Sequence, residues 1–359
     1  MWASDKGNNL LPVFRFLLFA LGILFAVPLL VILYLSIGIP ISSIGTLYLI
    51  GYFLIVCGLI STPWLRQRAL ILSLTGIAIL LLTVLVRVLF PPSGSQMILI
   101  TLPGPSAPRL LSRIFDEQDI VLFGAKVAPS VGFVSPLEYK NLIPELSQTF
   151  QEMRTQGVTP LSPSLTTYLG QQRPDGFDAL IAQPSSGNSE TGIIFLHGFG
   201  GNFTLQCWLI AELGNRLGAF TLCPSTDPSG QWWKEQGRAT LQESLNYLHR
   251  RGVKKIYLAG LSNGGIGSSR LASYFKNDLA GLILISGADP NAEITGLPVL
   301  VIHGRNDERI PASIAEQFSY LSAPNSTYVS FDGDHFVLLK QANQVQAAIL
   351  DWLMKHENR

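Results

Sequence analysis

The chain has 359 residues, which is enough for one large domain with additional segments. Its formal net charge is +1 and no Lys/Arg cluster stands out, so neither a polyanion nor a nucleic acid is expected as a partner. Only 14% of the residues are charged, whereas 48% are hydrophobic. The hydrophobic residues are concentrated in the first ninety positions, so the chain is not a uniformly soluble protein.

Three long apolar runs without a charged residue lie in this part, at residues 16–35, 44–60 and 69–86. Each run approaches the roughly 20 residues that an α-helix needs to cross the hydrocarbon core of a membrane. The alternative for the first run is a cleaved signal sequence, but the run is long for that and no small-x-small cleavage site follows it. We therefore expect residues 1–90 to form a membrane domain with three transmembrane helices.

The flanking charges predict the orientation of these helices. Lys6 and Arg15 precede the first run, and Arg66 and Arg68 lie between the second and third. Because positively charged flanks stay in the cytoplasm, both pairs indicate a cytoplasmic N-terminus. Arg87, at the exit of the third run, argues the other way unless it snorkels to the interface. The prediction is an integral protein of a plasma or inner membrane, with the C-terminal part on the extracytoplasmic side.

Residues 91–175 are predicted to be a connecting segment that is partly helical. Residues 97–102 read as a short strand. Ser135-Pro-Leu-Glu138 is a capping box with proline at the first helical position, and apolar residues at helical spacing follow over 142–153. The segment packs on the following domain, on the membrane or over a site, and the sequence leaves these three alternatives open.

A strand-turn-helix motif with a central serine follows in the last part of the chain. Residues 256–259 are an apolar run, and Gly260-Leu-Ser-Asn-Gly264 then matches Gly-x-Ser-x-Gly. Residues 266–275 are compatible with a helix. Small residues must flank the serine because such a turn is tight and strained. Ser262 is therefore predicted to be a nucleophile, and the alternative is a glycine-rich turn between a core strand and its crossover helix.

Together with His197-Gly-Phe-Gly-Gly-Asn202 upstream and with Asp307 and His335 downstream, this motif resembles the α/β-hydrolase family. The resemblance covers residues 176–359, which we expect to form the α/β-hydrolase domain. The residues that precede this range lie outside the family pattern. The resemblance implies a mostly parallel sheet with helices on both faces, here preceded by the three transmembrane helices.

The pattern of the chain itself agrees with this fold class. Apolar runs predict strands at 177–182, 192–196, 220–223, 255–259, 282–286, 299–302 and 327–331. Helices are predicted at 205–217, 232–250, 266–275, 314–321 and 341–356. Alternating strands and helices favour a parallel sheet, in which sites lie at the carboxyl ends of the strands.

A serine needs a base, because an alcohol at its ordinary pKa is a poor nucleophile. His335 follows Phe331-Asp-Gly-Asp334 and precedes the closing helix, which fits the family order of serine, acid and histidine. His197 and His303 each precede a glycine at a strand end, where a structural role is more usual. His335 is therefore the predicted base.

The acid that orients this imidazole is predicted to be Asp307, just after the strand 299–302. Asp289, which follows the preceding strand, is the rival. The oxyanion of an acyl transfer needs fixed donors, and two backbone N–H groups are candidates. One is that of Asn263, directly after the nucleophile, and the other is that of Phe199 or Gly200.

Trp232 and Trp233 are candidates for the substrate site, since they follow a turn beyond a strand's carboxyl end; the alternative is that both pack in the core. Residues 287–297 are too short for the helical cap that many relatives carry, so an open site is expected unless the connecting segment folds over it. Cys207 and Cys223 either form a disulfide in an oxidising compartment or remain two buried thiols.

The resulting hypothesis is a membrane-anchored serine hydrolase that resembles carboxylesterases. It would cleave a small-molecule or lipid-derived ester through a Ser-His-Asp triad and an acyl-enzyme, without a metal or an organic cofactor. An acyltransferase or a peptidase with the same triad is an alternative, because the chemistry is shared. A catalytically silent scaffold subunit of a membrane complex is the alternative from another functional class.

Overall fold

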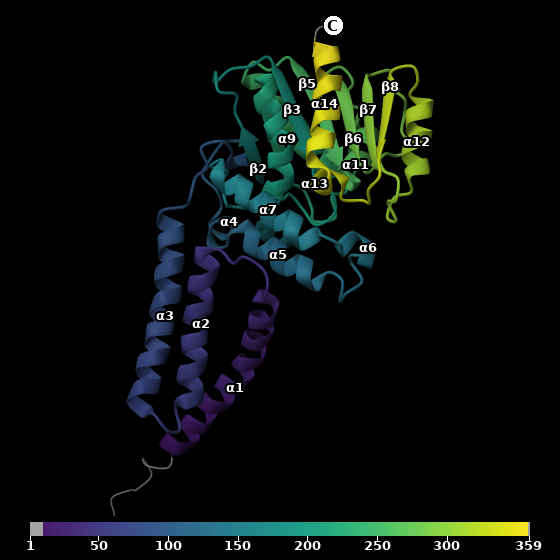
Figure 1. The fold of residues 1–359 in the computed structure, drawn as a ribbon. Helices are drawn as coiled ribbons and strands as arrows, with labels where there is room; N and C mark the ends of the chain where they lie inside the picture. Colours follow the sequence, from purple (N-terminus) through teal and green to yellow (C-terminus); the bar gives the residue numbers. More distant parts are fainter. Residues whose placement is uncertain (1–9, 358–359) are drawn as a thin grey trace, which may run out of the picture. The chain divides into compact units, whose positions relative to one another are not determined.

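The computed structural model describes residues 10–357, which fall into two compact units (Figure 1). The first unit holds the described residues up to Pro91 together with Ile114–Ala128. The second holds Pro92–Arg113 and the described residues from Pro129 onward. Lys6, which the orientation argument uses, lies outside the described residues.

The first unit contains α1 (Leu10–Ser36), α2 (Ser43–Ser61) and α3 (Arg66–Leu89). All three helices are long and apolar enough to cross a membrane, as the apolar runs predicted. Helices α2 and α3 approach closely at two glycines, where a Cβ on Gly51 would lie 3.1 Å from the carbonyl oxygen of Gly76. Small residues of this kind let the backbones of membrane helices pack against each other.

The fifth helix, α5 (Glu117–Val127), also belongs to this unit. The Asp119 carboxylate accepts hydrogen bonds from the backbone N–H of Ser42 (2.8 Å) and from its hydroxyl (2.6 Å), just before α2 begins. Arg87 near the end of α3 forms an ion pair of 2.8 Å with Asp116. The charge at the exit of α3 is therefore buried against a carboxylate and does not snorkel to solvent.

The second unit is built on one eight-stranded sheet with the order β1-β2-β4-β3-β5-β6-β7-β8. Its strands are β1 (Ile98–Leu102), β2 (Phe177–Ala182), β3 (Thr191–Leu196), β4 (Phe220–Pro224), β5 (Lys255–Leu261), β6 (Leu279–Ile285), β7 (Val299–Gly304) and β8 (Ser326–Phe331). Strand β2 is antiparallel to both of its neighbours, and from β4 to β8 all neighbours are parallel. The mostly parallel sheet predicted from the sequence is confirmed.

Helices cover both faces of this sheet, as predicted. They are α9 (Thr204–Leu217), α10 (Glu235–Arg250), α11 (Asn263–Leu271), α12 (Ala312–Leu321), α13 (Val337–Lys340) and α14 (Ala342–Glu357). Helices α9 and α14 lie over the face of the sheet that is turned to the viewer in Figure 1, and they contact each other. Buried residues of α10, α11 and α12 form one apolar cluster with residues of the strands. The core therefore consists of the sheet and the helices packed on it.

Strand β1 lies in the part of the sequence that we assigned to a connecting segment. It pairs with β2 from Ile98 opposite Ile181 to Leu102 opposite Phe177, and so forms an edge of the sheet. The family resemblance was assigned from residue 176 onward. Strand β1 fell outside it, because one short apolar run far upstream of the motifs carries no family pattern of its own. The strand-like run itself was predicted and is confirmed.

The capping box predicted at Ser135 is present. The Ser135 N–H donates to Glu138 (2.9 Å), and the Glu138 N–H donates to the Ser135 hydroxyl (3.3 Å). It caps the short α6 (Pro136–Tyr139), because the chain turns at Asn141, with φ of 62°, before α7 (Leu142–Thr155) begins. Helix α7 contacts α9 and α13, so this part of the connecting segment packs against the sheet-bearing part of the second unit, which we also call the hydrolase-like unit. The remaining short helices are α4 (Leu110–Ile114) and α8 (Ser164–Tyr168).

Cys207 and Cys223 form a disulfide, with Cα atoms 6.0 Å apart. The bond links the first turn of α9 to the end of β4. Of the two alternatives left open by the sequence, the structure has the disulfide, because both cysteines lie near the same edge of the sheet.

Candidate active site

Ser262 lies in a tight turn between β5 and α11. Its backbone has φ of 55° and ψ of −119°, and its N–H donates to the carbonyl of Ile285 (2.8 Å). A Cβ at Gly260 would collide with the carbonyl of Gly264, and a Cβ at Gly264 would collide with that of Leu196. Only glycine fits at these two positions, which is the physical reason for the Gly-x-Ser-x-Gly pattern.

The structure brings Ser262, His335 and Asp307 together at the carboxyl end of the sheet. The hydroxyl of Ser262 lies 2.9 Å from Nε2 of His335, and Nδ1 of His335 lies 2.7 Å from Oδ2 of Asp307. His335 and Asp307 are each only 7% exposed. In this geometry Nδ1–H donates to the carboxylate and Nε2 accepts the serine proton, which is the arrangement a general base requires.

The carboxylate of Asp307 is held by several donors. Its Oδ1 accepts the backbone N–H groups of Arg309 (2.9 Å) and Ile310 (3.0 Å), and its Oδ2 also lies 3.2 Å from Nε2 of His303. Burial alone would raise the pKa of Asp307, but the hydrogen bonds from His303 and His335 hold it well below its ordinary value. The group is therefore ionised whenever His335 acts as a base.

His303, which the sequence suggested as structural, contacts the proposed acid directly. It is fully buried and also lies 2.8 Å from the carbonyl of Ile310. Because it precedes Asp307 by four residues at the end of β7, the spacing His-Gly-x-x-Asp was the signal for this contact. Sequence reasoning did not use it.

Asp289, the rival acid, is engaged elsewhere. Its carboxylate pairs with Arg270 of α11 (2.5 Å) and accepts the N–H of Asn291 (3.0 Å). Its own N–H donates to the Ser269 hydroxyl (3.0 Å). These bonds tie the loop after β6 to α11, whereas the loop after β7 carries the partner of His335.

We expect Asp307→Asn to lower kcat by about 10⁴-fold, because the amide would favour the wrong imidazole tautomer and would not stabilise its cation. Asp289→Asn is the matched control and should change kcat by less than about 10-fold. Steady-state hydrolysis of a nitrophenyl ester measures both variants. The reverse order of the two losses would reassign the acid to Asp289.

The loop after β3 is supported from within by His197. Nδ1–H of this buried ring donates to the carbonyl of Gly198 (2.8 Å), and Nε2 accepts the N–H of Thr226 (3.2 Å). Burial lowers the pKa of His197 to about 4, although the Gly198 carbonyl and Asp227 act in the opposite direction. His197 is thus a neutral structural residue at neutral pH.

One of the predicted oxyanion donors is not available. The N–H of Gly200 donates to the carbonyl of Pro228 (2.8 Å), since the backbone of Gly200 (φ of 100°) turns it into the loop. The remaining candidates are the N–H of Phe199 and that of Asn263, the first residue of α11. The Asn263 side chain donates to Ser229 (2.8 Å), which holds the two loops together.

The tryptophans proposed for the substrate site have other contacts. Trp232 is fully buried, and its Nε1–H donates to the carbonyl of His197 (2.9 Å). It supports the loop after β3 from the core and has no exposed surface with which to line a pocket. The ring of Trp233 is partly buried under the guanidinium of Arg270, 4.7 Å from its centroid. The core alternative is therefore correct for Trp232.

Residues of the connecting segment contact the loops of the candidate site, and sequence reasoning did not identify these contacts. The ring of Phe133 lies 5.5 Å from that of Phe199, and Glu138 pairs with Arg309, two residues after Asp307. The capping box marked Glu138 as a helix cap, but no local pattern indicates that its carboxylate also binds an arginine more than a hundred residues downstream.

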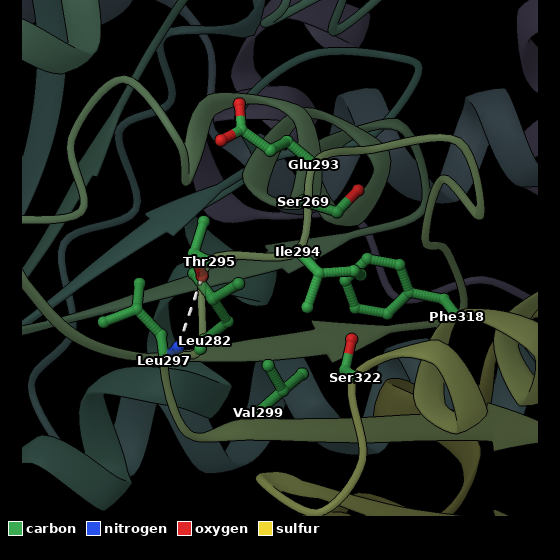
Figure 2. A pocket seen from close by; sticks show the side chains of 10 residues that line it. Ser269, Leu282, Glu293, Ile294, Thr295, Leu297, Val299, Phe318 and Ser322 are labelled. Carbon is green, nitrogen blue, oxygen red and sulfur yellow. Dashed lines mark hydrogen bonds between the residues drawn. The ribbon is translucent and has the colours of Figure 1, made fainter.

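A separate small pocket lies between α11, β6 and α12 (Figure 2). Ser269, Leu282, Ile294, Leu297 and Phe318 are among its lining residues, and its empty volume is about 220 Å³, including open solvent at its mouth. None of its lining residues is Ser262, His335 or Asp307. It is therefore distinct from the candidate active site.

Comparison with solved structures covers about half of this chain. No family model and no curated protein matches this sequence. Its structure is similar to Est1E from Butyrivibrio proteoclasticus, with 18% identity and a TM-score of 0.44 over 51% of this chain and 96% of that one. A thermophilic esterase from Thermogutta terrifontis has 18% identity and a TM-score of 0.42 over 52% of this chain and 97% of that one. The esterase Pf2001 from Pyrococcus furiosus has 14% identity and a TM-score of 0.43 over 50% of this chain and 87% of that one.

The second unit has the α/β-hydrolase fold. Its sheet, in which β2 is antiparallel to its neighbours, and the serine turn between β5 and α11 are the features of this fold. The described part of this chain also includes the three candidate membrane helices that precede this fold.

Proposed function

We propose that this protein is a membrane-anchored serine hydrolase that cleaves carboxylic esters. The observation that carries the proposal is the continuous hydrogen-bonded chain from Ser262 through His335 to Asp307. A buried, ionised acid behind the imidazole and a serine on a strained turn are what nucleophilic acyl transfer requires. A silent scaffold has no need for these aligned contacts.

In the first half of the reaction Nε2 of His335 takes the proton of Ser262 while Oγ attacks the ester carbonyl carbon. The N–H groups of Phe199 and Asn263 donate to the resulting oxyanion. Asp307 stabilises the imidazolium. The imidazolium then protonates the alkoxide as the bond from the carbonyl carbon breaks, so that the alcohol leaves and the acyl group remains on Ser262.

In the second half a water molecule takes the place of the alcohol. His335 accepts its proton, the hydroxide attacks the acyl-enzyme, and the carbon–Oγ bond breaks. The proton returns to Oγ of Ser262, and the carboxylic acid is released. The sum is one ester and one water converted to one acid and one alcohol.

Fluorophosphonate labelling of the full chain in membranes tests this proposal directly, since the probe reacts with an activated serine. We expect one adduct, and peptide mass spectrometry should place it on Ser262. Turnover of a simple ester by the same preparation should accompany it. Absence of labelling, or an adduct on another residue, would contradict the proposal.

The membrane orientation is part of the same proposal. Three candidate spanning helices, a basic residue (Arg68) in the first turn of the third, and the cytoplasmic preference of positive flanks support a hydrolase unit outside the cytoplasm. The disulfide between Cys207 and Cys223 also supports it, because disulfides persist in oxidising compartments.

Reporter fusions are expected to confirm this orientation. A fusion after Ser95 should read as extracytoplasmic and a fusion near Gln67 as cytoplasmic, because an odd number of crossings separates the N-terminus from the hydrolase unit. As a control, each of the two sites is fused in turn to a reporter that is active only in the cytoplasm and to one that is active only outside it, and the two readings should be opposite. A cytoplasmic signal after Ser95 would reverse the orientation and would remove the compartment argument for the disulfide.

The substrates are proposed to be esters with short acyl groups. Residues 287–297 between β6 and β7 are all described and contain no helix, so no cap domain is inserted there. We expect kcat/KM for nitrophenyl esters from acetate to palmitate to peak at the short members, because a site without a deep apolar tunnel gains little from additional methylenes. A maximum at laurate or palmitate would instead indicate a lipase-like enzyme acting on lipid-derived esters.

A further inference from the structure

Residues 129–140, which we call the arm, connect the end of α5 to α7 and belong to the hydrolase-like unit. The arm contains the capping box at Ser135 and the single turn of α6. No residue of the arm is needed for the proposed chemistry. Its contacts nevertheless converge on the loops that hold the reacting groups.

The first attachment of the arm is an ion pair with the loop of the acid. The carboxylate of Glu138, only 3% exposed, accepts two hydrogen bonds from Arg309, one from Nε (2.5 Å) and one from Nη2 (3.0 Å). Burial would raise the pKa of Glu138, but the bonds from Arg309 and from the N–H of Ser135 bring it below its usual value. This two-point pair, unlike a single exposed one, fixes the geometry of both partners.

The second attachment is to the loop of the base. Nζ of Lys340 donates to the backbone carbonyl of Glu138 (2.6 Å) and to the carboxylate of Asp334 (2.6 Å). Asp334 directly precedes His335 and accepts the N–H of Phe336 (2.9 Å). The arm is thus fastened to both loops whose positions decide the Asp307–His335 contact.

These attachments place Phe133 between two loops from different strands. Its ring is tilted by 35° against the ring of Phe199, and the guanidinium of Arg309 lies 5.0 Å from its centroid. Phe199 follows β3, whereas Arg309 follows β7, and β5 and β6 lie between these strands in the sheet. Three strand spacings amount to about 14 Å. Phe133 therefore joins two loops whose strands lie on either side of β5, the strand that precedes Ser262.

Both rings leave part of their surface uncovered, since Phe133 is 44% and Phe199 is 57% exposed. The N–H of Phe199 is a candidate oxyanion donor, so its side chain is attached directly beside the position of the reacting carbonyl. An apolar group of the ester that covered these rings would gain by removing apolar surface from water. A ring would gain further from offset or edge-to-face contact, with fewer rotors to immobilise than a chain.

We propose that Phe133 and Phe199 form an apolar subsite that binds a ring-bearing group of the ester, with the arm as its fixed wall. The proposal rests on the proposed function and names a substrate class for it. The ring belongs either to the acyl part or to the alcohol part of the ester, because both parts are attached to the carbonyl carbon that Ser262 attacks.

The test compares Phe133→Ala with the wild-type full chain in detergent, using methyl acetate, methyl phenylacetate and benzyl acetate. We expect kcat/KM to fall by about 10-fold for one of the two ring-bearing esters and to stay within about 2-fold for methyl acetate. A selective loss on methyl phenylacetate assigns the acyl side, and one on benzyl acetate assigns the alcohol side. Phe133→Leu, which keeps an apolar side chain without a ring, should give an intermediate loss.

Tyr320→Ala is the matched control, since Tyr320 is an aromatic residue that is 82% exposed in the last turn of α12. It should leave the ratio among the three esters unchanged. An equal loss on all three esters, or no change in their ratio, would overturn the subsite. Fluorophosphonate labelling of Phe133→Ala and Phe133→Leu at the wild-type rate shows that the triad is intact in these variants. A wild-type chain that hydrolyses none of the esters would refute the proposed function itself, which is a different outcome.

Discussion

Ser262→Ala is expected to abolish both fluorophosphonate labelling and ester hydrolysis. Oγ of Ser262 is the atom that forms the acyl-enzyme in the proposed reaction, and no other hydroxyl among the described residues lies within hydrogen-bonding distance of Nε2 of His335. Loss of a nucleophile of this kind costs on the order of 10⁶-fold in kcat, and the residual rate comes from the oxyanion donors and binding alone. Gel fluorescence after labelling and a nitrophenyl ester assay measure the two effects.

Ser147→Ala is a suitable control, because the hydroxyl of Ser147 only donates to the carbonyl of Ile143 within α7. This variant should label and hydrolyse as the wild type does. Hydrolysis that persists in Ser262→Ala at more than about a hundredth of the wild-type rate would mean that a different residue is the nucleophile. The strained backbone of Ser262 would then have another explanation.

His335→Ala is expected to lower kcat by about 10⁵-fold or more, since serine and histidine act as one unit and removal of either leaves the other without function. KM should change much less than kcat, because the imidazole acts in the transition state and not in ground-state binding. Steady-state kinetics with a soluble nitrophenyl ester separates the two parameters. Added imidazole is expected to restore part of the rate, since the substitution leaves space where the ring was.

His249→Ala is the corresponding control. His249 lies at the end of α10, where its ring contacts Asp278 at 3.3 Å and the carbonyl of Val253 at 3.1 Å. Its loss should leave kcat within about 2-fold of wild type. Equal losses in the two histidine variants would show that the assay reports stability and not catalysis.

The pH profile of the wild type helps to assign these effects. The folded-state pKa of Asp307 is lowered, so its ionised form contributes stability above its ordinary pKa of about 3.9, and this contribution is lost only as the pH falls through the lower folded value. Asp307 therefore stays ionised through the neutral range. A decline of kcat/KM on acidification within the neutral range therefore does not come from protonation of Asp307.

The sequence by itself was sufficient for the features that depend on neighbouring residues. The turn at Ser262 could be predicted because only glycine fits at positions 260 and 264, and this steric requirement is visible as a local motif. The three helices long and apolar enough to cross a membrane could be predicted because the hydrocarbon core sets the length of such helices and excludes charge. The parallel strands followed from short apolar runs that alternate with helical segments.

Element boundaries were less predictable. The helix expected at 266–275 spans Asn263–Leu271, because the turn places Ser262 directly at the helix N-terminus, and the strand expected at 282–286 spans Leu279–Ile285. The helix expected from residue 232 begins at Glu235, since Trp232 is buried beneath the loop after β3.

Only the tertiary structure could decide which groups meet across long stretches of chain. The sequence offered Asp307 and Asp289 as partners for His335, and the loop paths place Asp307 beside it while Arg270 holds Asp289. It likewise offered Gly200 as an oxyanion donor, but its N–H is directed to Pro228.

The same holds for the pairing of β1 with β2, for the bond between Cys207 and Cys223, and for the contacts of Phe133 and Glu138 with the loops of the site. Hydrogen bonds, disulfides and ring contacts depend on distances of a few ångströms between residues that lie far apart along the chain. Local propensity and hydrophobic period carry no information about such distances. They are set when the sheet, its helices and the segment before them pack into one core.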